Sequence, residues 1–197
     1  MEFFKPKMRS NTLFVALLAI LTALTTIATI VIAIPLPASS GFLNFGDALV
    51  MLSGLLLGPL GGFIAGGVGS AMGDVILGYV HFAPITLVVK GCEGLVMGLF
   101  SSRARSASLL TRWDVVGLIV SSFVMMTGYF LAEIPLYGYG AALAELLTAN
   151  WLQVAVGSIV TAIVGPVARS FLQDTLYMFE EEDLTLVQNE QIETPLE

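Results

Sequence analysis

The amino-acid sequence predicts an all-α integral membrane protein, a compact bundle of six transmembrane helices with both termini in the cytoplasm. Of its 197 residues, 56% are hydrophobic and only 12% are charged. A soluble globular domain carries about twice that share of charged residues. Several apolar runs are long enough to cross a bilayer, which takes about 20 residues in a helix. The chain length therefore suits one bundle with short loops and no separate soluble domain.

The first helix is expected over residues 12–34. It ends against Pro35 and Pro37, because proline cannot continue a helix. A secretory signal peptide is the competing interpretation. The apolar run is longer than the core of a signal peptide, which has about 7 to 15 residues, and the apolar segments that follow need no further export signal. We therefore expect a retained transmembrane helix.

Five more helices are expected further along the chain. The stretch Gly58-Pro59-Leu60-Gly61-Gly62 predicts a turn between two short, tilted or buried helices, because glycine and proline interrupt regular structure. A connection rich in Gly and Ala precedes the last helix. The five helices are expected over residues 46–57, 63–77, 84–101, 113–136 and 150–172.

The basic residues orient the predicted bundle. Seven of the eight Lys and Arg side chains fall on one side of six spans. Cytoplasmic loops carry an excess of basic residues, so this side is predicted to be cytoplasmic. The prediction is a multi-pass protein of the cell (plasma) membrane, with the loops near 35–45, 78–83 and 137–149 outside. The seven basic residues are Lys5, Lys7, Arg9, Arg103, Arg105, Arg112 and Arg169.

Three regions are expected: a cytoplasmic N-terminus at 1–11, a membrane domain that binds substrate at 12–172, and an acidic cytoplasmic tail at 173–197. The composition of the tail is typical of a solvated, partly disordered end. The single Cys92 and single His81 leave no disulfide and no set of His and Cys metal ligands. We therefore expect no cofactor, no metal and no catalytic residue. We also expect no nucleic-acid partner, since membrane topology accounts for the basic loop.

Two opposite charges interrupt the apolar stretch of the fourth expected helix. A charge near the bilayer centre costs roughly 2.5 to 3.5 kcal/mol on insertion scales, so such residues mark a site by default. Lys90 and Glu93 lie one turn apart on nearly the same helix face and can reach each other. Gly91 and Gly94 beside them leave room, which favours a cavity wall. A self-contained ion pair is the alternative.

Polar and aromatic side chains gather at the outer ends of the expected helices. Aromatic faces and polar edges are what a planar, heteroatom-rich small molecule needs. Other interpretations stay open, because Asn44 and Asp47 also fit a helix cap and Tyr79 and Phe82 also fit an interfacial aromatic belt. The candidate binding residues are Asn44, Tyr79, Phe82, Lys90, Glu93, Tyr129, Glu133, Asn150, Trp151 and Gln153.

Two further features leave alternatives open. Asp74 and Glu133 are the acids that a stand-alone proton-coupled carrier or a membrane-embedded enzyme would use, because intramembrane acids form proton relays. A purely structural membrane subunit is a third function class. Ala19 and Ala23 are small residues at helical spacing, which suits either internal packing or the docking of another membrane protein.

Four motifs occur in an order that resembles a known family. They are Asn44-Phe-Gly-Asp47, then Gly58-Pro59-Leu60-Gly61, then Phe82-Ala-Pro84 leading to Lys90-Gly-Cys-Glu93-Gly94, and finally Asn150-x-x-Gln153. Over residues 10–172 the pattern resembles the substrate-binding S component of an energy-coupling factor (ECF) vitamin transporter. The nearest branch is that for riboflavin, pyridoxine and hydroxymethylpyrimidine.

The resemblance implies a non-enzymatic subunit that binds a vitamin-like heterocycle from outside and delivers it inward. It also implies three partners, a transmembrane T component and two ABC ATPases, and a docking face at Ala19 and Ala23. The first outer loop, about 35–43, would close the pocket. The identity of the vitamin does not follow from the residues. Ligand contacts are implied for Asn44, Lys90, Glu93, Tyr129, Glu133, Asn150 and Gln153.

Overall fold

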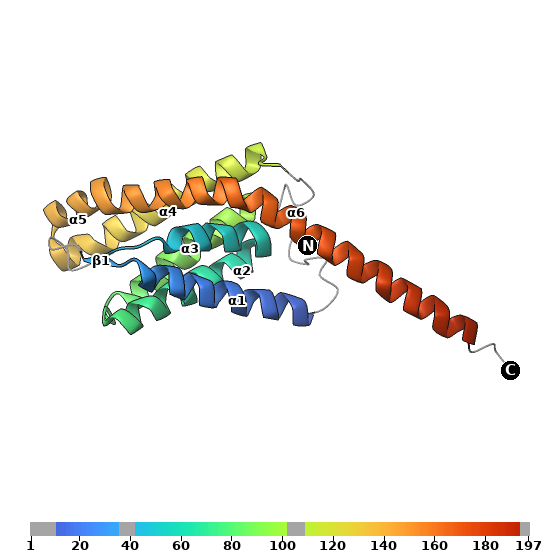
Figure 1. Cartoon of the computed structure of the whole chain (residues 1–197). Coiled ribbons are helices and arrows are strands. Elements are labelled where there is room, and N and C mark those ends of the chain that lie inside the picture. Colours follow the sequence, from blue (N-terminus) through green and yellow to red (C-terminus); the bar gives the residue numbers. More distant parts are fainter. Residues whose placement is uncertain (1–10, 36–41, 102–108, 194–197) are drawn as a thin grey trace.

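The fold is built from helices that lie side by side (Figure 1). The computed structural model describes residues 11–35, 42–101 and 109–193. A two-residue antiparallel pair, β1 (Ile34–Pro35) and β2 (Phe42–Leu43), joins the first two helices. The all-α prediction is confirmed. The helices are α1 (Asn11–Val31), α2 (Gly46–Leu77), α3 (Ala83–Ser101), α4 (Arg112–Tyr137), α5 (Tyr139–Glu145), the π-helical turn η2 (Leu146–Asn150) and α6 (Trp151–Glu193).

Parts of the sequence-based predictions fall on residues that the structure does not describe. These include most of the predicted N-terminal region at 1–11 and residues 36–41 of the predicted closing loop. The basic residues among them are Lys5, Lys7, Arg9, Arg103 and Arg105.

Five helices in the described part of the chain are long and apolar enough to cross a membrane. The sequence predicted six spans, because the residues on the two sides of Gly58 were expected to form separate helices. Here both sides belong to α2, which is interrupted at Gly58 with φ 79° and ψ −169°. A positive φ of this kind favours glycine, and the following Pro59 cannot donate a backbone hydrogen bond, so the helix breaks at this point.

The two arms of α2 pack against each other and against α3. A Cβ atom added at Gly62 would lie 2.6 Å from the Cα of Gly54, and one added at Gly66 would lie 2.7 Å from a methyl of Val50. These pairs are placed symmetrically about Gly58, so the helix folds back on itself there. The carbonyl of Gly94 in α3 lies so close to Gly54 and Gly62 that neither position has room for a side chain.

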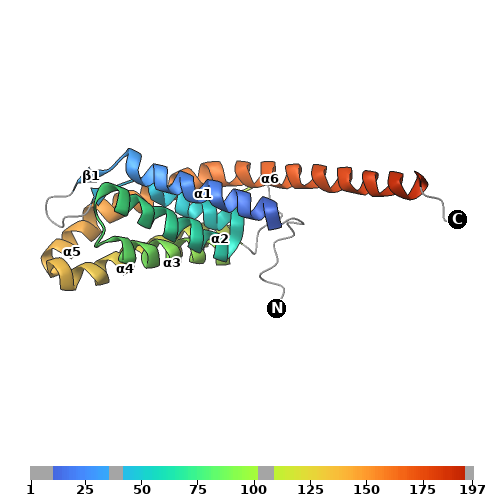
Figure 2. The same cartoon turned by 90° about the horizontal axis from the view of Figure 1, so that it is seen from below.

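The helix α2 forms the centre of the bundle. It contacts α1, α3 and α6, while α4 packs against α3 and α6. The apolar core between these helices contains Met51, Met97 and Met125, all fully buried. The helix α6 continues well past the bundle in both views (Figure 1, Figure 2).

A buried polar cluster joins α3, α4 and α6 at the end of the bundle from which α6 projects. Thr111 caps the start of α4 in a reciprocal capping box with Asp114. The Asp114 carboxylate also accepts hydrogen bonds from Ser101 at 2.9 Å and from Arg169 at 3.1 Å. The charge of Arg169 offsets the cost of burying this carboxylate. The strands and α5 lie at the opposite end (Figure 1).

Candidate substrate-binding site

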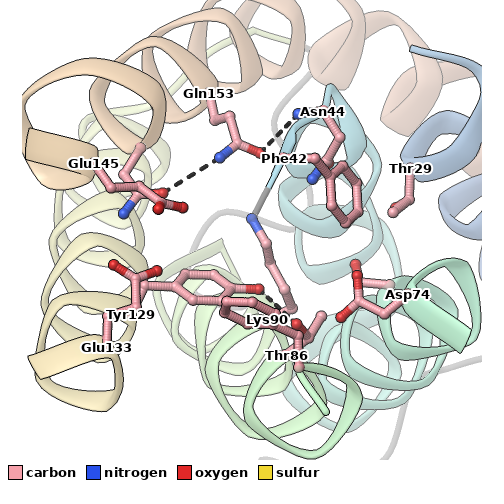
Figure 3. A pocket seen from close by; sticks show the side chains of 13 residues that line it. Thr29, Phe42, Asn44, Asp74, Thr86, Lys90, Tyr129, Glu133, Glu145 and Gln153 are labelled. Carbon is pink, nitrogen blue, oxygen red and sulfur yellow. Dashed lines mark hydrogen bonds between the residues drawn. The ribbon is translucent and has the colours of Figure 1, made fainter. Parts of the chain in front are cut away.

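A polar pocket lies at the end of the bundle that carries β2 and α5. Its volume is about 30 Å³, and most of its lining side chains are polar or charged although the bundle around it is apolar (Figure 3). All the major helices contribute to it. The lining residues are Thr29, Phe42, Asn44, Ser70, Asp74, Phe82, Thr86, Lys90, Tyr129, Glu133, Glu145, Asn150 and Gln153.

Most of the ten candidate residues line this pocket, and three do not. Tyr79 is half-buried and packs its ring on Phe42, with centroids 4.7 Å apart. Glu93 is fully buried next to Lys90. Trp151 is 60% exposed, because two helical residues turn through about 200° and Gln153 occupies the inner face. The candidates in the pocket are Asn44, Phe82, Lys90, Tyr129, Glu133, Asn150 and Gln153.

Lys90 reaches the pocket and is also held by two acids. Its ammonium forms a salt bridge with Asp47 at the start of α2 and lies 3.5 Å from Glu93 Oε2. It also lies 5.7 Å from the centroid of the Tyr129 ring. Burial of an ammonium is tolerated where such partners are close. The ion-pair alternative is therefore realised, with Asp47 as an additional partner, and of the two charges only Lys90 lines the pocket. The expected room beside them is absent, because Gly91 packs against Phe63 and Gly94 against Gly62.

An amide network connects the β2 end of the chain with η2 and α6. Gln153 accepts a hydrogen bond from the backbone N–H of Asn44 at 3.2 Å and donates one to Asn150 at 3.4 Å. The side chain of Asn44 accepts from the N–H of Gly46 at 2.8 Å, a local turn bond just before α2. The N-cap of α2 is Phe45, which has no side-chain cap bond, so the expected Asn44 cap is not formed. Within the described residues, Asn150 Nδ2 has no hydrogen-bond partner. Asn150 therefore keeps a donor group for another molecule.

Several pocket residues were not among the ten candidates. Thr86 accepts a hydrogen bond from the Tyr129 hydroxyl at 2.9 Å. Asp74, considered above only for proton coupling, is buried on the pocket wall. Glu145 lies at the end of α5, in a stretch that was expected to be a connection. In the sequence, Glu145 is a charged residue within an apolar stretch, the same feature that identified Lys90 and Glu93.

The four motifs and the polar pocket lie within the part of the chain that matches a known family. A family model described as "ECF-type riboflavin transporter, S component" matches residues 9–177. The chain belongs to this family. As an S component it is a subunit of a membrane transport system and not an enzyme. The resemblance drawn from the motifs is thereby confirmed.

Two relatives of this S component differ in how much of the chain they share. A protein of Pyrococcus woesei, described as "Uncharacterized protein in gap 3'region", is 46% identical over 120 residues, which is 61% of this chain and 78% of the relative. The thiamine precursor transporter HmpT of Lactococcus lactis subsp. cremoris (strain MG1363) is 30% identical over 151 residues, or 76% of this chain and 84% of HmpT.

Proposed function

We propose that this S component captures a vitamin-like heterocycle of the riboflavin, pyridoxine or hydroxymethylpyrimidine class from outside the cell. The observation that carries the proposal is the buried pocket, where charged and amide groups converge in an apolar bundle. Polar groups that face a cavity inside the membrane mark a substrate pathway. The name of the relative HmpT, a thiamine precursor transporter, also favours a small heterocycle.

Each pocket residue has a role in this proposal. The rings of Phe82 and Tyr129 stack on the heterocycle, while Asn150 and Gln153 bond its edge. Lys90 meets a carbonyl or hydroxyl oxygen. Asn44 and Glu133 complete the set of ligand contacts. The remaining three candidates act from outside the pocket: Glu93 through Lys90, Tyr79 through Phe42, and Trp151 at the membrane interface.

The proposed orientation has six crossings in the plasma membrane with both termini in the cytoplasm. The reversal of α2 at Gly58 supports six crossings, since each arm then runs the opposite way. Arg112 and Arg169 belong to the end of the bundle opposite the pocket, as the bias of basic residues toward the cytoplasm requires. The pocket then opens to the outside, and the acidic tail extends into the cytoplasm.

The proposed partners are a transmembrane T component and two ABC ATPases, which supply the energy for release inside. The support comes from α1, which packs against α2 with one face and leaves the other exposed. Ala19 and Ala23 both lie on the exposed face, next to Ile20 and Leu24. Small residues of this kind let another helix approach closely.

Ligand entry requires the pocket to open. A volume of about 30 Å³ is far below the roughly 300 to 1,000 Å³ of typical small-molecule sites. Phe42 on β2 is buried and lines the pocket. Movement of the β1–β2 pair would therefore uncover the site, in keeping with the role that the family resemblance implies for the first outer loop.

Equilibrium binding tests the proposal. The full chain, purified in detergent without partners, is expected to bind at least one of riboflavin, pyridoxine and hydroxymethylpyrimidine with nanomolar or micromolar affinity. Gln153→Ala should weaken binding because it removes an amide of the pocket wall. The neighbouring, exposed Leu152 offers a control, and Leu152→Ala should bind like the wild type. Absence of binding to all three ligands would contradict the proposed function.

A further inference from the structure

Three residues of the pocket form a chain of hydrogen bonds across the helices α2, α3 and α4. We propose that Thr86, anchored by Asp74, is a positioning residue that holds the ring of Tyr129 in the orientation in which it stacks on the ligand. Thr86 then acts through Tyr129 and not by its own contact with the ligand. The inference rests on the proposed function, which makes Tyr129 a stacking residue, and it is the same for each of the three heterocycles.

The geometry of the hydrogen bonds is the first argument. The hydroxyl of Tyr129 donates to Thr86 Oγ1 at 2.9 Å. The side chain of Thr86 also forms a hydrogen bond with the carboxylate of Asp74. Figure 3 shows Thr86 between the Tyr129 hydroxyl and Asp74. The chain therefore joins a residue of α2, one of α3 and one of α4 at the pocket.

The direction of these hydrogen bonds follows from the groups that make them. A carboxylate only accepts hydrogen bonds, whereas a threonine hydroxyl donates one and can accept others. Thr86 therefore donates its single proton to Asp74, and its oxygen is the acceptor for Tyr129. Hydrogen bonds in series polarise and strengthen one another away from water. Asp74 thus makes Thr86 a better acceptor for the Tyr129 hydroxyl.

Burial of the chain is the second argument. Thr86 and Asp74 are each only 3% exposed. A buried polar group that loses its partner costs free energy, so orientations of Tyr129 that break the bond to Thr86 are disfavoured. Thr86 is β-branched, and rotation about its Cα–Cβ bond is restricted within a helix. The acceptor for the Tyr129 hydroxyl therefore stays in one place.

Packing fixes the other end of the Tyr129 side chain. A Cβ added at the preceding Gly128 would lie 3.0 Å from each of the two methyl groups of Val89, so α4 lies close against α3 at this point. The backbone of Tyr129 is thereby placed next to α3, and the bond to Thr86 holds the far end of the ring. A ring held at both ends presents the same face to each ligand, and stacking depends on that orientation.

Substitution of Thr86 in the full chain tests the inference. The probe is riboflavin, pyridoxine or hydroxymethylpyrimidine, whichever the wild type binds most tightly. Thr86→Val keeps the shape of the side chain without the hydroxyl and should weaken binding about five- to tenfold, the effect of one lost hydrogen bond. Thr86→Ser keeps the hydroxyl and should bind within about twofold of the wild type. Wild-type affinity in Thr86→Val, or an equal loss in both variants, would overturn the inference.

A double-variant comparison separates positioning from direct contact. Tyr129→Phe keeps the ring and removes the same hydrogen bond from its other end, so it should also weaken binding. If Thr86 acts through Tyr129, the addition of Thr86→Val to Tyr129→Phe should weaken binding little further. Losses that multiply in the double variant would show that Thr86 acts on the ligand independently, and the positioning role would be wrong.

Thr161→Val is the matched control. Thr161 is also a fully buried threonine, and its hydroxyl donates to the carbonyl of Ala48 in another helix at 3.2 Å, but it does not line the pocket. Thr161→Val should lower the melting temperature and leave the affinity for the probe unchanged. If it weakens binding as much as Thr86→Val does, the loss reflects general destabilisation and contradicts the inference.

The same data separate the two proposals. If the wild type binds a heterocycle and Thr86→Val binds it equally well, the positioning role is wrong and the capture function stands. If the wild type binds none of the three heterocycles, both proposals fail. Because Tyr129→Phe removes the same hydrogen bond from the opposite side, a Thr86→Val protein that does not fold cannot remove the test.

Discussion

Lys90 connects two buried acids next to the pocket. It joins Asp47 of α2 to Glu93 of its own helix and at the same time lines the pocket. Removing one partner from a buried ionic cluster is more costly than removing the whole cluster, because the remaining charges lose their compensation. The lysine is therefore expected to stabilise the fold as well as to contact the ligand.

Replacement of Lys90 tests this role. Lys90→Met should lower the free energy of unfolding by about 3 to 5 kcal/mol, since it leaves two buried acids without a cation. Stability is measured by denaturation in detergent micelles. The triple variant that adds Asp47→Asn and Glu93→Gln should recover most of the loss. A Lys90→Met protein as stable as the wild type would show that the cluster does not hold the helices together.

Single residues also show what the sequence could and could not predict about the site. Lys90 and Glu133 were predictable because a charge within an apolar helix stands out by its cost. Trp151 was expected in the pocket, but the orientation of the helix surface exposes it, while Asn150 and Gln153 point inward. The π-helical turn η2 directly precedes Trp151, and a single sequence has no pattern that distinguishes such a turn from an ordinary helix.

At the scale of elements, local signals predicted where most helices begin, and packing decided how they join. The stretch at Gly58-Pro59 marked the break within α2, but α1 ends at Val31 instead of 34, and α6 continues to Glu193 although its end was predicted at 172. The connection at 137–149 was expected to be irregular because it is rich in Gly and Ala, yet it forms α5 and part of η2. Contacts with α4 stabilise these short helices, and such tertiary contacts are not visible in local composition.

The close approach of α2 to α3 gives a prediction for a glycine. Gly54→Ala should destabilise the protein by about 1 to 3 kcal/mol, because the added methyl group would overlap the carbonyl of Gly94. Thermal unfolding in detergent measures the effect. Gly140 in α5 is the control, since a Cβ added there meets nothing within 4 Å, and Gly140→Ala should be nearly neutral. Equal melting temperatures for the two variants would argue against tight α2–α3 packing.

At the scale of the whole molecule, binding and coupling are expected to lie in different places. The pocket occupies the end near β2 and α5, whereas the exposed face of α1 runs along the side of the bundle. A variant on that face can therefore disturb partner docking without disturbing the pocket. This separation is what distinguishes a capture subunit from a carrier that works alone.

A bulky substitution on α1 tests the docking face. Ala23→Trp should prevent the chain from co-purifying with the T component and the ATPases, while its affinity for the ligand stays within about twofold. Ile163 on α6 is also exposed to the surroundings of the bundle, so Ile163→Trp is the control and should assemble normally. Normal assembly of Ala23→Trp would place the docking surface elsewhere.

Uptake into proteoliposomes tests whether this S component captures its substrate and depends on ATPase partners to deliver it. The chain alone should bind the heterocycle and accumulate none. The chain reconstituted with the T component and both ATPases should accumulate it when ATP is supplied. Accumulation by the chain alone, driven by a pH gradient and lost in Asp74→Asn, would contradict the account and identify a proton-coupled carrier.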